Sequence, residues 1–469
     1  MSLVTFTDPV EPDRAVLGGK GASLVRMVQL GLPVPPGFVL GTPVGRAWLA
    51  DGALPAGLDA DIDAALAGLE RELGRRLGDP EAPLLVSVRS GAPVSMPGMM
   101  DTILNVGLGD AVVEALAART GDPQFAWSSY ERLLDSYADT VRGLPRADIE
   151  DALFDAVPEG EDEAARARGT VRVLKDLIAA AGTPFPQDPR AQIDECLEAV
   201  FRSWRSPRAD AYRAHRGIDP QIGTAAVVQS MVFGNRGPTS GSGVAFSRDP
   251  STGAPGAYGD VLFDAQGEDV VAGTADPEDL HALAERLPEV HAELVRVLEG
   301  LERSARDLVE CEFTVEEGRL WILQFRPAQR SGRAAVRFAA DAVAENLLEP
   351  AAAAALVTDE QLEGASAPRF AAEAPTEDVL ARGLAASPGA AVGAAVFDAG
   401  RAQVRAQAGE DVVLVRPTTS PADVHGFIAS VAIVTGRGGR TSHAAVVARG
   451  MGRPAVCGVG EVLVARDGA

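Results

Sequence analysis

Residues 437–449 read RGGRTSHAAVVAR and follow an apolar, strand-like run at 431–434. The order is therefore a strand, a glycine turn, two hydroxyl residues, a single histidine and a stretch that favours helix. Thr441 or Ser442 is the expected N-cap, which places His443 in the first turn of that helix. The pattern predicts an α/β segment with a histidine between its strand and its helix.

The expected position of His443 suits a histidine that carries a phosphoryl group. Free backbone N–H groups and the positive end of the helix dipole would surround a negative charge attached to the imidazole. The alternative is a helix-capping turn with an incidental exposed histidine, and histidine also serves as general base or metal ligand. Spacing alone leaves these interpretations open.

The composition sets the class of protein and its partners. A length of 469 residues predicts about three units, and 46% hydrophobic residues provide ample core. The formal charge of −23 argues against nucleic acid as a partner, but not against a nucleotide bound by a local group of cations. We see no secretory signal and no apolar run long enough to span a membrane. Three widely spaced cysteines fit a reducing, cytoplasmic location.

Periodicity and turn residues divide the chain into segments of different character. A glycine turn at 18–21 precedes a helical pattern at 22–30, and helical patterns dominate from about 110 to 215. Strand signals return at 225 and continue to about 330. Residues 331–380 indicate a helical connector, and 383–469 form a second α/β segment. The fold class is therefore α/β.

Residues 310–326 predict a β-hairpin. A three-residue loop with Gly318 in the left-handed position would pair residue 310 with 324 and residue 312 with 322. Because side chains alternate along strands, the hairpin has two faces. The polar face would carry Glu310, Glu312, Gln324 and Arg326. The apolar face would carry Cys311, Phe313, Leu323 and Phe325.

The polar face of this hairpin can bind a metal and phosphates. Two carboxylates and an amide form a hard-oxygen site suited to Mg²⁺, and Arg326 can bind a phosphate through two N–H groups. The alternative is a solvated face with an ion pair.

Other candidates for phosphate or nucleotide contacts lie elsewhere in the chain. Lys20, one of only two lysines, lies in the glycine turn, and Arg89 lies at the end of a strand. Gln229 and Met231 open a glycine- and serine-rich run that could wrap phosphates through backbone N–H groups. Glu268 lies in an acidic turn and could contact the nucleotide or its ribose. Singly, each could equally be an ordinary surface or loop residue.

Together these segments resemble pyruvate phosphate dikinases along essentially the whole chain. The matching stretches are GGKGASLVRMVQLGLPVPPGF (18–38), LLVSVRSGAPVSMPGMMDTILNVGL (84–108), FRSW (201–204), QSMVFGNRGPTSGSGVAFSRDPSTG (229–253), AQGEDVVAG (265–273), ECEFTVEEGRLWILQFR (310–326), SPGAAVG (387–393) and GRGGRTSHAAVVARGMGRPAVCG (436–458).

The resemblance implies an ATP-grasp-type nucleotide-binding domain at 1–330, with a helical insert at about 110–215. A helical connector at 331–382 and a swivelling phosphohistidine domain at 383–469, incomplete at its end, would follow. ATP would pyrophosphorylate the histidine, and inorganic phosphate would remove the terminal phosphoryl group. The phosphohistidine would then pass its phosphoryl group to pyruvate.

The same resemblance assigns roles to residues by position. Catalysis would involve His443, Arg89 and Arg326. The nucleotide would be bound by Lys20, Arg89, Arg132, Gln229, Met231, Glu268, Glu312, Gln324 and Arg326. Mg²⁺ would be held by Glu310, Glu312 and Gln324. Thr441 matches a position at which some family members are regulated by phosphorylation.

The sequence also departs from the family pattern. The barrel that binds pyruvate and phosphoenolpyruvate is expected on a separate or missing domain. Pro93, Glu310 and Phe325 stand where the family usually has a basic residue, an aspartate and a threonine. Two alternatives stay open: transfer of the phosphoryl group to another small acceptor, and a non-catalytic nucleotide-binding regulatory module. The oligomeric state is open as well, with a homodimer as one expectation.

Overall fold

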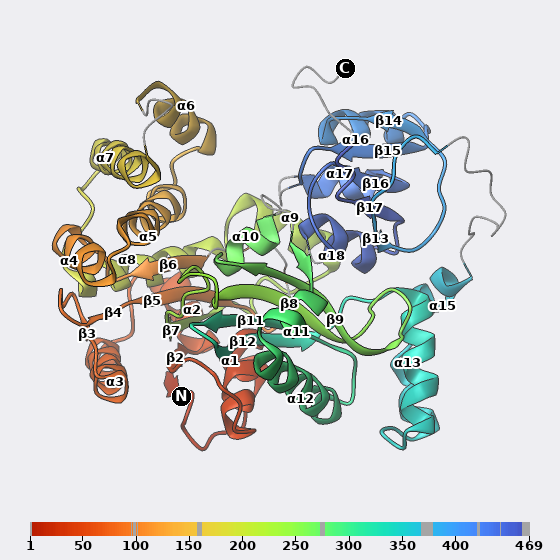
Figure 1. Ribbon diagram of the computed structural model, residues 1–469, viewed down its shortest axis with the longest axis horizontal. Coiled ribbons are helices and arrows are strands. Elements are labelled where there is room, and N and C mark those ends of the chain that lie inside the picture. Colours follow the sequence, from red (N-terminus) through yellow and green to blue (C-terminus); the bar gives the residue numbers. More distant parts are fainter. Residues whose placement is uncertain are drawn as a thin grey trace. The chain divides into compact units, whose positions relative to one another are not determined.

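The computed structural model describes residues 2–94, 96, 100, 102–156, 162–272, 277–366, 379–419, 423–440 and 442–461 (Figure 1). The chain separates into two compact units, 1–232 and 233–469. Each unit contains both helices and sheet, so the expected α/β class is confirmed. Within the described residues, the structure has no helix of sufficient length and apolarity to cross a lipid bilayer.

The first unit is built on a five-stranded antiparallel sheet in the order β1-β2-β7-β5-β6. Its strands are β1 (Leu3–Thr5), β2 (Gly37–Leu40), β5 (Val86–Gly91), β6 (Thr102–Val106) and β7 (Ala225–Ser230). All six residues of β7 are buried, as expected for a central strand covered on both faces. A separate pair is formed by β3 (Arg76–Leu77) and β4 (Pro83–Leu84).

Helices flank this sheet. Those near the sheet are α1 (Arg14–Gln29), α2 (Thr42–Asp51), α3 (Leu58–Leu73) and α8 (Pro189–Ser203). The expected helical insert contains α4 (Asp110–Thr120), α5 (Pro123–Ser136), the π-helical turn η1 (Tyr137–Val141), α6 (Arg146–Ala156), α7 (Glu163–Ala180), α8 and α9 (Pro207–Arg216). Asp122, Asp162 and Asp188 cap α5, α7 and α8 through their side chains, which fixes where these helices begin.

The glycine turn expected at 18–21 is instead a kink inside α1. Gly18 adopts φ 68° and ψ 167°, whereas the residues on either side of it are helical. A Cβ on Gly18 would lie 1.7 Å from the carbonyl oxygen of Gly91, so only glycine allows α1 to approach the end of β5. Lys20 therefore lies in the second part of α1 and not in a free turn.

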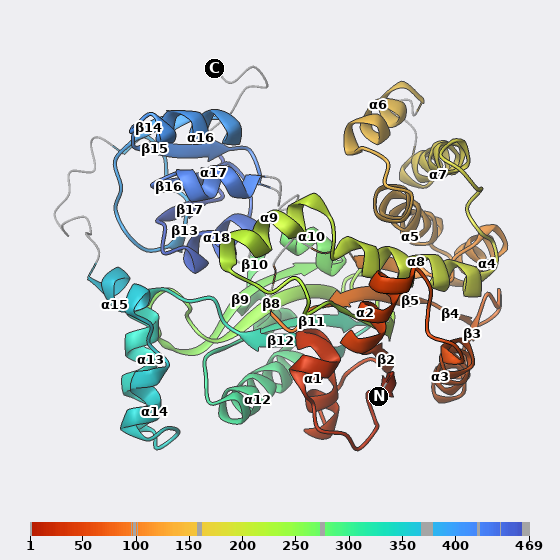
Figure 2. The same ribbon diagram turned by 180° about the vertical axis from the view of Figure 1, so that it is seen from behind.

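The second unit contains two five-stranded sheets (Figure 2). The first, which we name the hairpin sheet, is antiparallel with the order β10-β9-β8-β11-β12. Its strands are β8 (Gly241–Arg248), β9 (Pro255–Phe263), β10 (Glu278–Asp279), β11 (Val309–Glu316) and β12 (Arg319–Pro327). The helices of this region are α10 (Gly267–Ala272), α11 (His281–Arg286) and α12 (Pro288–Ala305). Leu294, Leu298 and Leu301 of α12 are buried at helical spacing.

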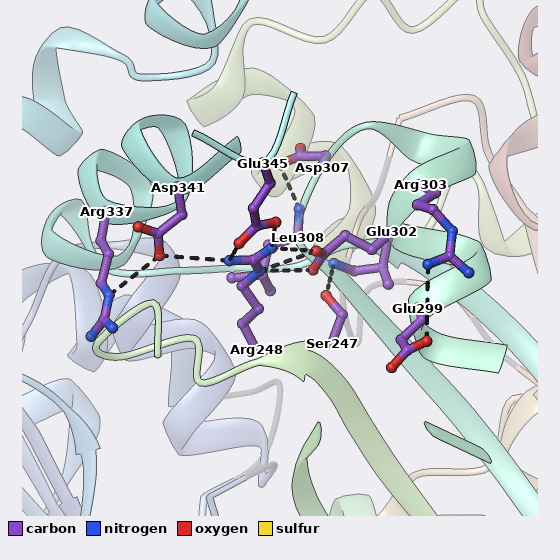
Figure 3. A network of polar contacts seen from close by, with 11 residues as sticks. Ser247, Arg248, Glu299, Glu302, Arg303, Asp307, Leu308, Arg337, Asp341 and Glu345 are labelled. Carbon is purple, nitrogen blue, oxygen red and sulfur yellow. Dashed lines mark hydrogen bonds and ion pairs between the residues drawn. The ribbon is translucent and has the colours of Figure 1, made fainter. Parts of the chain in front are cut away.

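The connector expected at 331–380 is helical where the structure describes it. It contains α13 (Gly332–Ala344), α14 (Pro350–Ala355) and α15 (Asp359–Ala365). A buried arginine ties α13 to the hairpin sheet (Figure 3): Arg248 of β8 bonds to Glu302 of α12 and to Glu345 at the end of α13. This network makes α13 a firmly attached part of the second unit.

The second sheet of this unit, the histidine sheet, has the order β13-β17-β16-β15-β14. Its strands are β13 (Leu384–Ser387), β14 (Ala394–Val396), β15 (Val412–Arg416), β16 (Ala432–Thr435) and β17 (Ala455–Cys457), and the helices are α16 (Ala399–Gln407), α17 (Val424–Ala429) and α18 (His443–Gly450). Strands β14 to β17 pair in parallel. Loops that follow β15 and β16 therefore meet at one edge of the sheet.

All three cysteines are buried and free. Cys196 lies in α8, Cys311 in β11 and Cys457 in β17. Burial raises the pKa of each thiol above its usual range. These residues therefore pack as small apolar side chains.

Candidate active site

His443 is the first residue of α18, as the sequence predicted. Ser442 is the N-cap residue with an extended backbone, but its side chain makes no capping hydrogen bond. The other expected cap, Thr441, lies outside the described residues. The N–H groups of the first turn are thus not occupied by the Ser442 side chain.

The turn before His443 depends on glycine. Gly438 has φ 105°, a conformation that other residues rarely adopt, and a Cβ there would lie 3.1 Å from the side chain of Ser442. The backbone of Arg437 donates to the carbonyl of Pro417, 2.9 Å away, which joins this turn to the loop after β15. The glycine turn therefore sets where α18 begins.

The His443 ring has one nitrogen with a partner and one without. Its Nδ1 lies 3.5 Å from Oγ1 of Thr419. Its Nε2 is buried and has no hydrogen-bond partner among the described residues. The Phe427 ring packs nearly perpendicular to the His443 ring, with 5.8 Å between the ring centroids. In the tautomer with a proton on Nδ1, the ring donates to Thr419 and leaves the Nε2 lone pair available.

The surroundings of His443 favour the neutral imidazole. Burial lowers the pKa of His443 below 6.5, while the nearby carboxylate of Asp423 acts in the opposite direction. Asp423 is itself buried, with its Oδ1 3.6 Å from Nη2 of Arg416. At neutral pH the ring is therefore uncharged, which is the form that can act as a nucleophile.

Sequence reasoning missed Thr419 and Asp423. Both lie in or next to the loop that follows β15, and His443 follows β16, the adjacent parallel strand. The available signal was a pair of threonines directly after an apolar strand, at the carboxyl edge where site residues of parallel sheets gather.

The hairpin at 310–326 exists, but its register differs from the expectation. Glu316 pairs with Arg319 across a two-residue turn, in which Glu317 and Gly318 both have positive φ (49° and 80°). A bulge at Leu323 then shifts the pairing, so that residue 310 faces 326 and residue 312 faces 324. The predicted pairs 310–324 and 312–322 are therefore wrong.

The shared polar face of the hairpin is nevertheless present. Nε of Arg326 donates to Oε1 of Glu310 at 3.1 Å, and Nε2 of Gln324 donates to Oε1 of Glu312 at the same distance. The Glu310 charge raises the pKa of the Arg326 guanidinium, despite burial. The bulge alters the apolar face: Ile322, not Leu323, lies opposite Phe313 and is fully buried.

The donor set of this face fits a hard cation. Glu310 is 2% exposed, and its Oε2 is buried without a hydrogen-bond partner in the parts of the chain that are described. Two carboxylates and one amide oxygen are the ligand types that Mg²⁺ takes. In the same parts, the structure has no cluster of three or more His, Cys, Asp or Glu side chains arranged for a metal. A cation here would thus rely on the amide of Gln324 and on substrate oxygens as well.

The first unit brings several predicted phosphate-binding residues to the end of β5. Arg89 lies in β5, and its Nη1 donates to Oε1 of Gln229 at 3.3 Å. Lys20 is close by, because a Cβ built on Gly91 would lie 3.5 Å from the Lys20 Cβ. Gln229 is buried and donates to the carbonyl of Pro35, so it positions Arg89.

The remaining predicted residues lie in three other parts of the fold. Met231 is half-buried just after β7, where its backbone N–H donates to Leu85 at 2.8 Å. Arg132 is half-buried in α5 of the helical insert. Glu268 lies in α10, a helix and not the loop that the sequence suggested.

Two protein families match separate segments of this chain. Residues 46–290 match the family described as "Pyruvate phosphate dikinase, AMP/ATP-binding domain". Residues 408–469 match the family described as "PEP-utilising enzyme, mobile domain", and this match includes His443 and its turn.

Individual relatives agree with the family matches. The chain is 47% identical over 460 residues to "Pyruvate, phosphate dikinase 1, chloroplastic" of Arabidopsis thaliana, covering 96% of this chain and 48% of that protein. It is 48% identical over 459 residues to the protein of the same name from Oryza sativa subsp. japonica, with the same coverage. It is 46% identical over 461 residues to "Pyruvate, phosphate dikinase 2" of Zea mays, covering 96% of this chain and 52% of that protein. The chain thus spans about half the length of these relatives, and it belongs to the pyruvate phosphate dikinase family.

Proposed function

We propose that this chain phosphorylates His443 with ATP and inorganic phosphate, the histidine-phosphorylating half of a dikinase reaction. The observation that carries the proposal is the buried imidazole at the start of α18. Its Nε2 has no protein partner in the described chain, and its pKa is lowered by burial. A neutral ring with an available lone pair, next to helix N–H groups, is suited to accept and hold a phosphoryl group.

The proposed chemistry has two steps. First, Nε2 of His443 attacks the β-phosphorus of ATP, and the bond between that phosphorus and the bridging oxygen of AMP breaks. AMP leaves with that oxygen. Inorganic phosphate then accepts the terminal phosphoryl group, which gives pyrophosphate and leaves phosphohistidine. The proton of Nδ1 stays on the Thr419 side of the ring throughout.

The side chains assigned to the nucleotide would act mainly by positioning the substrate and neutralising charge. We assign Lys20, Arg89 and Arg326 to phosphate oxygens, supported by the hydrogen bonds that hold Arg89 and Arg326 in place. The remaining proposed nucleotide contacts are Arg132, Gln229, Met231, Glu268, Glu312 and Gln324.

We further propose Mg²⁺ as cofactor, held by Glu310, Glu312 and Gln324. The support is the hard-oxygen character of this face and the buried, unpartnered Oε2 of Glu310 among the described residues. When bound, the cation would neutralise charge on phosphate oxygens.

The organisation proposed for the chain is a nucleotide-binding domain at 1–330, a connector at 331–382 and a phosphohistidine domain at 383–469. Pyruvate and phosphoenolpyruvate would bind to a separate or further domain, since the relatives named as pyruvate, phosphate dikinases are about twice as long as this chain. A cytoplasmic location, a homodimer and regulation at Thr441 stay predictions. Several relatives are named as chloroplastic proteins.

Labelling with ATP that carries ³²P in the β-position tests the proposal. The chain alone should acquire acid-labile, base-stable label and form AMP in a phosphate-dependent manner. His443→Ala should abolish the label. His425→Ala is the matched control, because His425 is an exposed histidine of the same domain, in α17.

Two results would contradict the proposal. Equal labelling of His443→Ala would place the phosphoryl group elsewhere, and no labelling of the unaltered chain would favour a non-catalytic module. Formation of phosphoenolpyruvate from pyruvate by these 469 residues alone would refute the assignment of the acceptor to another domain. Movement of the label from the protein to an added small acceptor would instead indicate a phosphotransferase with a different acceptor.

A further inference from the structure

The glycine turn before His443 contacts the hairpin sheet of the same unit. Arg440 forms an ion pair with Asp279 of β10. Its guanidinium carbon also lies 5.4 Å from the centroid of the Tyr258 ring in β9, within the range of a cation–π contact. Arg440 thus joins the turn that precedes His443 to one edge of the hairpin sheet.

The backbone next to Arg440 approaches this edge closely. A Cβ on Gly439 would lie 2.6 Å from Oδ2 of Asp260 and 2.5 Å from Cγ of Pro277. A Cβ at these distances would force a neighbouring side chain to move, so the close contact favours glycine at this position. Asp260 is 2% exposed, and the turn at Gly439 is one of the elements that lie against its carboxylate.

A buried arginine supports the turn from behind. Nη1 of Arg449, in α18, donates to the carbonyl of Arg440 at 2.9 Å and to that of Ala386 at 2.8 Å. The Arg449 guanidinium also lies 5.6 Å from the ring centroid of Phe246 in β8. Arg449 is 3% exposed, so the backbone of Arg440 is fixed in the orientation that presents its side chain to β9 and β10.

We propose that Arg440 is a docking residue. Its contacts with Asp279 and Tyr258 seat the glycine turn on the hairpin sheet, the sheet that carries Glu310, Glu312, Gln324 and Arg326. Arg440 is therefore a positioning residue for phosphorylation of His443, and this role rests on the proposed function. The docking contact itself is independent of that function.

The charge arrangement makes the proposed contact sensitive to charge and salt. The side chains of Arg440 and Asp279 are 27% and 56% exposed, so their ion pair is screened by salt and is weak alone. A negative residue at 440 would face the carboxylates of both Asp279 and Asp260. Like charges across an interface oppose the correct approach strongly, even where the original pair contributed little.

The test compares Arg440→Glu, Arg440→Lys and the control Arg437→Glu. Arg437 is an exposed residue of the same turn, so its variant has the same charge change without the contact. The first readout is hydrogen exchange of the backbone at 277–281 and 436–440. The second is the initial rate of His443 labelling from ATP, with the KM for ATP.

Arg440→Glu should speed exchange in both segments about tenfold and slow labelling about tenfold, with KM for ATP unchanged. Arg440→Lys and Arg437→Glu should stay within about twofold of the unaltered chain. Added salt should slow exchange in Arg440→Glu, because it screens the repulsion from Asp279 and Asp260, whereas it should speed exchange in the unaltered chain by weakening the ion pair. The double variant Arg440→Glu/Asp279→Arg should recover part of both losses. Gly439→Ala should reproduce the exchange effect through a steric clash.

The outcomes separate the two proposals. Faster exchange in Arg440→Glu supports docking even if the unaltered chain takes no label, in which case only the proposed function fails. If Arg440→Glu and Gly439→Ala match the unaltered chain in exchange, the docking role is overturned whatever the labelling shows.

Discussion

Oγ1 of Thr419 lies 3.5 Å from Nδ1 of His443, and the two residues follow adjacent parallel strands of one sheet. The backbone of the sheet, and not a local motif, therefore brings them together. A hydroxyl at Nδ1 holds the ring in one orientation and leaves Nε2 for chemistry. The relationship gives the hydroxyl a positioning role that substitution can measure.

Replacement of Thr419 by valine should slow labelling of His443 about 10- to 100-fold, because the ring loses its orienting partner. Thr419→Ser keeps the hydroxyl and should retain most of the rate. Thr418→Val makes the same change one residue earlier and should have little effect. Rapid-quench measurement of the labelling rate, with circular dichroism to confirm folding, checks this prediction. Equal rates for Thr419→Val and Thr418→Val would show that the hydroxyl does not orient the ring.

The labelling rate should depend on the ionisation of His443. Only the neutral ring attacks, and burial lowers its pKa below 6.5, so the rate should rise to half its maximum at a pH below 6.5 and then stay level. Asp423→Asn removes the carboxylate that raises the pKa and should move the midpoint to still lower pH. A midpoint above 6.5 in the unaltered chain would contradict this account of the site.

The lowered pKa of His443 also links protonation of this residue to the stability of the fold. The unfolded chain binds the proton more readily than the folded chain, so the His443 contribution to stability is complete above about pH 6.5. It is lost as the pH falls towards the lower folded pKa. Urea unfolding at several pH values, compared with His443→Gln, should therefore show a steeper loss of stability on acidification when His443 is present. Parallel pH dependences for the two proteins would exclude the linkage.

The polar face of the hairpin should control the requirement for a divalent cation. Glu312→Gln removes one carboxylate and should raise the Mg²⁺ concentration for half-maximal labelling about tenfold or more. Glu317→Gln, at the exposed turn of the same hairpin, makes the same change outside that face and serves as control. Titration of the labelling rate with Mg²⁺ gives the comparison. An unchanged Mg²⁺ requirement in Glu312→Gln would remove Glu312 from the proposed ligands.

The Arg248 network in Figure 3 should contribute strongly to stability. Arg248→Met leaves the nearly buried carboxylate of Glu302 without its partner, which should cost about 3–5 kcal/mol of unfolding free energy. Arg303→Met breaks an exposed pair with Glu299 and should cost less than about 1 kcal/mol. Denaturant unfolding of both variants measures the difference. Equal losses would mean that burial of Arg248 does not determine its contribution.

The sequence predicted most elements near the site, because their signals are local. The helix start at His443 and the hairpin at 310–326 follow from alternation, turn residues and hydroxyl residues next to a helical run. The polar face of the hairpin was correct although the pairing was not. The extra residue at the Leu323 bulge offsets the turn that is one residue shorter than expected, so the same side chains still share the polar face. No local sequence pattern predicts a bulge.

Other features depend on contacts between distant residues and could not be predicted from local patterns. The kink at Gly18 exists because α1 meets the carbonyl of Gly91, and these residues are far apart in sequence. Thr419 and Asp423 reach His443 only through the order of parallel strands. A search for polar residues after each strand of the final segment would have identified Thr419 as a candidate.

The three buried cysteines give this protein a practical advantage. Because Cys196, Cys311 and Cys457 are enclosed and their thiols resist ionisation, maleimide dyes should leave the folded chain unmodified. A single thiol introduced at a surface position would then be the sole point of attachment. Fluorescent reporters can thus be placed on either unit without first removing any native sulfur.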